Sequence, residues 1–99
     1  MNNIYSVNEI KTTLNPIFDL YGVRKAVLFG SYAMGEATDR SDVDLMIDCD
    51  QRGLKFYGIV NAIEIELQKQ CDVFRSSSIV KDSPISKEIE NTGVVIYET

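Results

Sequence analysis

The sequence contains no histidine among its 99 residues. Histidine is the usual general base near neutral pH, the commonest zinc ligand, and the proton acceptor of Ser-His and Cys-His nucleophilic sites. Its absence excludes each of these arrangements. Acid–base chemistry in this chain must therefore rest on carboxylates, lysines or tyrosines.

Cysteine and long apolar runs are scarce as well. Cys49 and Cys71 have neither CxxC spacing nor a histidine nearby, which argues against zinc or a structural disulfide and predicts two reduced, buried thiols. No apolar run approaches the roughly 20 residues of a membrane helix, and the first residues lack the basic leader and apolar core of a secretion signal. We therefore expect a cytoplasmic protein.

The net charge of −5 limits the choice of partners. A protein that binds nucleic acid without sequence preference neutralises phosphates with Lys and Arg, so direct nucleic-acid binding is not expected here. An acidic surface instead suits a basic protein partner. A chain of 99 residues fits one compact domain, residues 1–99, and has no room for a second independent core.

The spacing of apolar residues predicts an alternation of helices and strands. A capping box at Ser6–Glu9 starts the first helix, which we expect to end at Gly22 and to kink or break at Pro16. The remaining predicted elements are strands at 25–29 and 42–48, a helix at 55–70, a strand at 71–74, a loop at 76–84, a short helix at 86–91 and a strand at 94–97. This order predicts an α/β (α+β) fold with a mixed sheet flanked by helices.

The first chemical signal is the Gly30-Ser31 turn that follows the strand at 25–29. A strand followed by a glycine and a helical turn presents free backbone N–H groups and a hydroxyl, which is how proteins hold phosphates. Asp42 and Asp44 come next on one predicted strand, and strand side chains alternate, so both point the same way. Two carboxylates are thereby expected beside a phosphate-binding turn.

Two like charges this close repel each other unless a cation neutralises them. Oxygen ligands without nitrogen or sulfur favour Mg²⁺ or Mn²⁺, and Mg²⁺ is usually held by one or two carboxylates together with substrate phosphates. A two-metal displacement needs a further carboxylate, and Asp72 lies in the predicted strand after the long second helix. If that strand neighbours the Asp42 strand, the three aspartates share one site.

This pattern resembles the polymerase-β-like nucleotidyltransferases, and within them the minimal nucleotidyltransferases of bacteria and archaea. The resemblance covers nearly the whole chain and implies ATP bound with two Mg²⁺ ions and transfer of AMP to a hydroxyl. By position, Asp42, Asp44 and Asp72 would be catalytic and bind metal, while Ser31 would hold the triphosphate. The matching positions are Gly30, Ser31 and Gly35, then Ser41, Asp42 and Asp44, and finally Asp72.

The resemblance also implies a partner. Many minimal nucleotidyltransferases are antitoxins that pair with a HEPN-domain ribonuclease toxin and inactivate it by adding AMP to a tyrosine. A protein adenylyltransferase that forms a hetero-oligomer with such a toxin is therefore the expected function. One departure is that many relatives carry a basic residue where this chain has Tyr32 or Met34, and Arg40 is the nearest basic candidate within the motif.

Several alternative interpretations of these residues exist. Glu36 and Ala37 stand where a P-loop needs Lys and Ser or Thr, and Arg52 occupies a ligand position of a calcium loop, so neither motif is predicted. An Asp-x-Asp pair by itself is more often a solvated strand edge, and Asp72 alone could be a surface residue. Two other functions stay open: a non-catalytic antitoxin that covers its toxin, and transfer to the hydroxyl of a small molecule.

Overall fold

The fold is a four-stranded mixed sheet with helices on both sides. The computed structural model describes residues 4–99. Its elements, in chain order, are α1 (Val7–Leu20), β1 (Lys25–Phe29), β2 (Val43–Asp48), α2 (Leu54–Leu67), β3 (Cys71–Arg75), a 3-10 turn (Ser76–Ser78), α3 (Pro84–Thr92) and β4 (Val94–Glu98). No helix within these residues is both long and apolar enough to cross a membrane.

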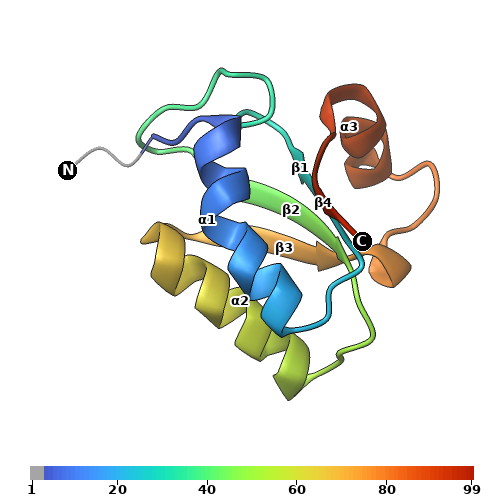
Figure 1. Ribbon diagram of the computed structural model, residues 1–99. Helices are drawn as coiled ribbons and strands as arrows, with labels where there is room; N and C mark the ends of the chain where they lie inside the picture. The colour runs from blue at the N-terminus through green and yellow to red at the C-terminus, as the bar shows by residue number, and fades with distance from the viewer. Residues whose placement is uncertain (1–3) are drawn as a thin grey trace.

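The strands lie in the order β3-β2-β1-β4. β1 is antiparallel to both β2 and β4, whereas β2 and β3 are parallel and are joined through α2. Figure 1 shows α1 and α2 side by side on one side of the sheet, with α3 set apart from them near β1 and β4. The predicted α/β class and mixed sheet are confirmed.

The face of the sheet under α1 and α2 is apolar. In the β1–β2 pairing, Ala26 lies opposite Ile47 and Leu28 opposite Leu45, and all four are buried. Burial of one such aliphatic side chain stabilises the fold by about 1.5–3 kcal/mol. The helices supply the other half of this core, with Ile10, Leu14, Ile17 and Phe18 from α1 and Ile59, Ile63 and Leu67 from α2.

The opposite face of the sheet mixes apolar and acidic side chains. Because side chains alternate along a strand, Phe29, Asp44 and Phe74 belong to this face. The rings of Phe29 and Phe74 are 6.1 Å apart, measured between their centroids. α3 lies on this side, because a Cβ at Gly93, directly after α3, would lie 3.0 Å from Cγ1 of Val27.

The first helix confirms one prediction and corrects another. Ser6 and Glu9 form the predicted capping box: the Ser6 hydroxyl accepts the Glu9 N–H at 3.0 Å, and the Glu9 carboxylate accepts the Ser6 N–H at 2.8 Å. Of the kink or break predicted at Pro16, the break is wrong, because α1 continues through it. Pro16 is exposed while Leu14 and Ile17 on either side are buried, so packing outweighs the missing hydrogen bond.

Further element boundaries differ from the predictions, and the helix predicted at 55–70 ends already at Leu67. β2 begins at Val43, so Asp42 precedes the strand instead of opening it. α3 is longer than predicted because Ser83 caps it, accepting the Ser86 N–H at 3.2 Å, and Pro84 fills its first position. The two cysteines are free and buried, as predicted.

Candidate active site

The candidate site begins with two aspartates on neighbouring strands. Asp44 of β2 lies directly opposite Asp72 of β3 in the parallel register. Next to the effect of burial, the negative charge of Asp72 acts on the Asp44 carboxyl and helps to raise its pKa. The adjacency of these two strands, on which the predicted carboxylate cluster depends, is therefore present in the fold.

The surroundings of Asp44 disfavour its negative charge. Burial is the first cause, and the charge of Asp72 is the second. Smaller contributions come from Glu88 of α3 and from Asp42. Together they raise the pKa of Asp44 from 3.8 to about 6. Within residues 4–99, neither Asp44 nor Asp72 has a Lys or Arg in salt-bridge contact.

The other acidic residues divide into two groups. Asp42 is exposed and contributes only charge to Asp44, so it lies at the outer side of the pair. Asp48 and Asp50 are held by Arg24, at 2.8 Å and 2.9 Å respectively, at the far end of β2. Arg24 lowers the pKa of Asp48 by hydrogen bonding. Asp48 is thus part of an ion pair at the other end of β2 from Asp44.

The turn at residues 30–36 presents unpaired backbone donors. Its carbonyls are used: Gly30 O accepts from Met34 N at 3.1 Å, and Ser31 O accepts from Glu36 N at 2.9 Å. In the described part of the chain, the N–H groups of Ser31 and Ala33 find no backbone acceptor, and the Ser31 hydroxyl has no hydrogen-bond partner. Such a turn has the donor arrangement of a helix N-terminus, which attracts anions.

Gly30 connects this turn to the aspartates. Its φ of +77° belongs to the left-handed region, and a Cβ placed there would lie 2.4 Å from Oδ2 of Asp44. Only glycine therefore allows the turn to approach the Asp44 carboxylate. Gly35 lies at the other end of the turn with φ of +72°, and a Cβ placed there would meet no atom within 4 Å. The hydroxyl of Ser41 accepts the Thr38 N–H at 2.9 Å and so shapes the loop leading to Asp42.

The two residues that depart from the family pattern lie differently. Tyr32 is buried in the core, whereas Met34 is about half exposed at 51%. Lys69, from the turn before β3, places its Nζ 5.9 Å from the centroid of the Tyr32 ring and 3.4 Å from the Asp39 carbonyl. The basic group beside Tyr32 is thus Lys69, while Arg40 is exposed in the loop at 38–41.

The chemistry of this carboxylate group suits a hard divalent cation. Its donors are oxygen atoms only, and the pKa of Asp44 is raised first by burial and then by neighbouring negative charges, which a cation would neutralise. No three acidic or cysteine side chains between residues 4 and 99 converge in the arrangement of a formed metal site. The structure therefore brings Asp44 and Asp72 together, and the three-carboxylate metal cluster stays a prediction.

Two residues near the site were not predicted from the sequence. Thr92, at the end of α3, accepts the Gly30 N–H at 2.8 Å across 62 positions of chain. Glu88, one helical turn earlier, contributes negative charge at Asp44. Short motifs and local periodicity carry no information on a contact of this length. Only a correct placement of the 86–91 helix over the acidic face could have indicated them.

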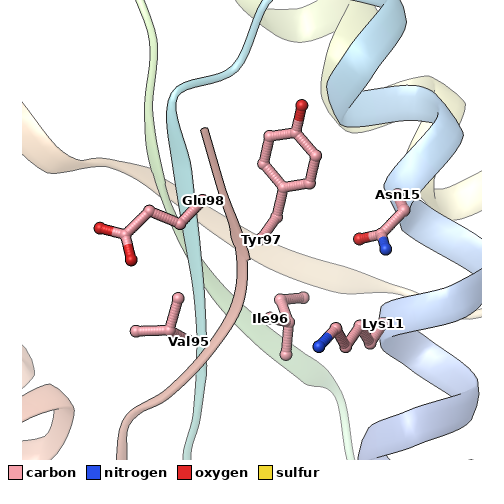
Figure 2. Close-up of a pocket in the computed structure, with 6 residues that line it drawn as sticks. All are labelled: Lys11, Asn15, Val95, Ile96, Tyr97 and Glu98. Carbon is pink, nitrogen blue, oxygen red and sulfur yellow. The ribbon is translucent and has the colours of Figure 1, made fainter.

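A separate hollow of about 350 Å³ lies at the β4 edge of the sheet. Figure 2 shows it between α1 and β4, with Lys11 and Asn15 facing Ile96 and Tyr97. With its amide oriented to match its neighbours, Asn15 donates to the carbonyls of Lys11 at 3.0 Å and Ile96 at 3.3 Å. This hollow is on the side of the sheet that α1 and α2 cover and at the edge opposite β3, so it does not belong to the aspartate site.

The chain matches a known protein family and several named relatives. Residues 9–99 match the family described as polymerase beta, nucleotidyltransferase. A putative protein adenylyltransferase of Methanocaldococcus jannaschii is 32% identical over 91 residues, covering 86% of this chain and 97% of that protein. The protein adenylyltransferase MntA of Thermococcus cleftensis is 38% identical over 61 residues, covering 60% of this chain and 62% of its own.

Solved structures agree with the fold. A chain from the crystal structure of a toxin–antitoxin complex with AMP-PNP superposes with a TM-score of 0.76 at 15% identity, covering 90% of this chain and 73% of that one. A chain from the complex of tri-AMPylated Shewanella oneidensis HEPN toxin with MNT antitoxin gives 0.71 at 12% identity, covering 94% and 73%. At these identities the likeness concerns the fold alone.

Proposed function

The chain belongs to the polymerase beta nucleotidyltransferase family, and from this premise we propose that it transfers AMP from ATP to a tyrosine hydroxyl of a cognate HEPN toxin, acting as an antitoxin. Relatives at 30–32% identity are named putative protein adenylyltransferases. The structural neighbours include an MNT antitoxin bound to an AMPylated HEPN toxin. These names supply the acceptor class and the transferred group.

The observation that carries the proposal is the contact of Asp44 and Asp72 beside the Gly30 turn. A nucleotidyl transfer needs a place for the triphosphate and carboxylates next to it. The free N–H groups and the Ser31 hydroxyl supply the first, and the aspartate pair supplies the second. No other acidic pair in the described residues adjoins a turn of this kind.

Each residue then has a role in the proposed reaction. Ser31 and the backbone of the turn bind phosphate oxygens, with Gly35 and Ser41 shaping the turn and the loop after it. Asp42 and Asp44 would hold two Mg²⁺ ions with Asp72, and the ions would neutralise the charge that develops on the phosphates. Asp72 is the exposed member of the pair. It either orients the tyrosine hydroxyl or accepts its proton while the oxygen attacks the α-phosphorus of ATP, and pyrophosphate leaves.

The proposal extends to assembly and location. The 99 residues act as one minimal nucleotidyltransferase domain that forms a hetero-oligomer with its toxin. Its net charge of −5 suits a partner with a basic surface, as an RNA-cleaving toxin requires. A cytoplasmic location supplies ATP and keeps Cys49 and Cys71 reduced.

Labelling of the product of the neighbouring gene with radiolabelled ATP and Mg²⁺ tests the proposal, which expects that product to be a HEPN toxin. The wild type should label a tyrosine of the toxin, and the double variant Asp42→Asn/Asp44→Asn should lose at least about a thousandfold in rate, the scale seen when groups at the reacting atoms are removed. Asp48→Asn/Asp50→Asn is the matched control, because it removes the same charge at the Arg24 end of β2.

The same experiment separates the alternatives. Equal labelling by the wild type and the Asp42/Asp44 variant would contradict the proposed site. Toxin inhibition that persists undiminished in that variant would instead favour a non-catalytic antitoxin that covers its toxin. Label found on a small hydroxyl compound, with none on the toxin, would favour the third function. Omitting Mg²⁺ and adding EDTA should abolish labelling if the metal ions are required.

A further inference from the structure

The hydroxyl of Thr92 bridges two distant parts of the fold. It donates to the Glu88 carbonyl at 2.8 Å within α3 and accepts the N–H of Gly30 at 2.8 Å. The bond to Glu88 is an ordinary bond of a helical threonine to the preceding turn, and it fixes the direction of the hydroxyl lone pairs. The bond to Gly30 is the unusual one, because it reaches the start of the candidate phosphate turn.

The Gly30 N–H depends on this bond. Gly30 is buried, and a buried backbone donor needs a partner, since water cannot replace it. No other acceptor for this N–H is found in the described chain. Thr92 thus determines where the turn leaves β1.

The position of Gly30 in turn sets the distance between the turn and Asp44. The space for a Cβ at Gly30 is already filled by Oδ2 of Asp44. A rotation of the Gly30 peptide would therefore move the donors at Ser31 and Ala33 relative to the carboxylate. The turn keeps its distance from the aspartate pair only while Gly30 stays in this position.

Thr92 is itself held rigidly. The next residue, Gly93, begins the return to the sheet, and a Cβ there would lie 2.5 Å from the Ile89 carbonyl and 3.0 Å from Cγ1 of Val27. The Gly93 N–H also donates to that carbonyl at 2.8 Å. β4 then pairs with β1 from Val94 onward. The end of α3 is fixed against the same strand from which Gly30 emerges.

We propose that Thr92 is a positioning residue for nucleotidyl transfer, whose hydroxyl fixes the Gly30-Ser31 turn at the distance from Asp44 that a bound triphosphate requires. The inference rests on the proposed function and adds a residue outside the Gly-Ser and Asp-x-Asp motifs. Thr92 touches neither substrate nor metal in this scheme. It acts through the backbone of Gly30, so its loss should affect ATP binding first.

The test compares Thr92→Val, which keeps the shape and loses the hydroxyl, with Thr92→Ser, which keeps the hydroxyl. Transfer of AMP to the toxin is measured against ATP concentration at a temperature where circular dichroism shows every variant folded. Thr92→Val should raise KM for ATP about tenfold, the scale of one lost hydrogen bond to a buried donor, with a smaller change in kcat. Thr92→Ser should stay within about twofold of wild type.

Hydrogen exchange supplies a readout that does not depend on activity. The Gly30 amide should exchange about tenfold faster in Thr92→Val than in wild type or Thr92→Ser, because its acceptor is gone. Thr12→Val is the matched control, since Thr12 is exposed in α1 and makes no side-chain hydrogen bond within residues 4–99. It should leave KM and the Gly30 exchange rate unchanged.

Three outcomes would overturn the inference. Wild-type KM in Thr92→Val would show that the turn does not need this hydroxyl. Equal impairment of the Val and Ser variants would show that the hydroxyl alone does not set the position of the turn, because Thr92→Ser keeps it. A lower melting temperature with unchanged KM would leave Thr92 a structural role only. Failure of the wild type to transfer AMP would refute the proposed function itself and this inference with it, which distinguishes the two failures.

Discussion

The two faces of the sheet are made from the same strands yet are built for different purposes. On one face, Ala26, Leu28 and Leu45 meet α1 and α2 and are buried completely. On the other, residues one position further along the same strands include Asp44 and Phe29, and the cover is the shorter helix α3. Period-two alternation thus separates a stabilising core from a polar site without any additional domain.

The difference has an energetic side. An apolar face gains stability from every side chain it buries, whereas half-burying Asp44 next to Asp72 costs free energy while both are ionised. That cost is tolerable because the helix-covered face is complete. The core therefore supports a site whose charges are arranged for a ligand and not for folding.

The largest expected effect is a loss of stability from a substitution on the face covered by α1 and α2. Leu45→Ala should lower the free energy of unfolding by about 2–5 kcal/mol, because the side chain is fully buried and leaves a cavity. Urea denaturation followed by circular dichroism measures the loss. Met46→Ala, one position away on the half-buried face, is the matched control and should cost clearly less. Equal losses would show that the two faces do not differ in the way described.

An intermediate effect with the opposite sign is expected on the acidic face. Since the pKa of Asp44 is raised from 3.8 to about 6, the folded state binds a proton more tightly than the unfolded state. The resulting stabilisation is complete below pH 3.8 and is lost as the pH rises through about 6. In EDTA, Asp44→Asn should therefore gain stability relative to wild type between pH 4 and pH 7.

Asp48→Asn is the control for this pH dependence. Arg24 lowers the pKa of Asp48, so ionised Asp48 favours the folded state and its removal should bring no gain at pH 7. Urea denaturation at several pH values compares the variants. A stability difference between wild type and Asp44→Asn that does not change with pH would contradict the account of Asp44.

The smallest expected effect is on the reactivity of Cys71, which lies on β3 next to Asp72 but faces the opposite side of the sheet. Burial, and then the charge of Glu64, raise the pKa of Cys71 to about 12. At pH 8 only about one thiol in ten thousand would be ionised, so iodoacetamide should leave Cys71 unmodified in the folded protein and alkylate it in urea. Peptide mass spectrometry measures the modification. Rapid alkylation of folded protein would show that this face opens readily.

The sequence was sufficient for the parts of the fold that local rules determine. The capping box at Ser6–Glu9, the strand at 25–29 and the alternation along β2 depend on near neighbours and on side-chain periodicity, and all are present. The predicted break at Pro16 failed because the cost of proline in a helix is a local quantity. It is outweighed by tertiary contacts of Leu14 and Ile17 that no local rule contains.

The candidate site also has parts that local sequence rules predict and parts that depend on long-range contacts. Asp44 and the Gly30-Ser31 turn were recognisable because their spacing is short, and the parallel register that pairs Asp44 with Asp72 is now visible. The contact of Thr92 with Gly30 spans 62 positions and joins two elements whose relative placement depends on the whole sheet. The proposed role of Asp42 in holding Mg²⁺ depends in addition on ligands whose positions the sequence does not determine.

The place of β3 at the outside of the sheet has a consequence for access. Among residues 4–99 no further strand lies beyond it, and the Asp72 side chain is exposed. For the proposed transfer to a protein tyrosine, we therefore expect the acceptor to reach Asp72 from this edge of the sheet, so that a bulky substrate does not have to enter a closed cleft. The rate of each cycle would then depend on how quickly the two proteins associate and dissociate.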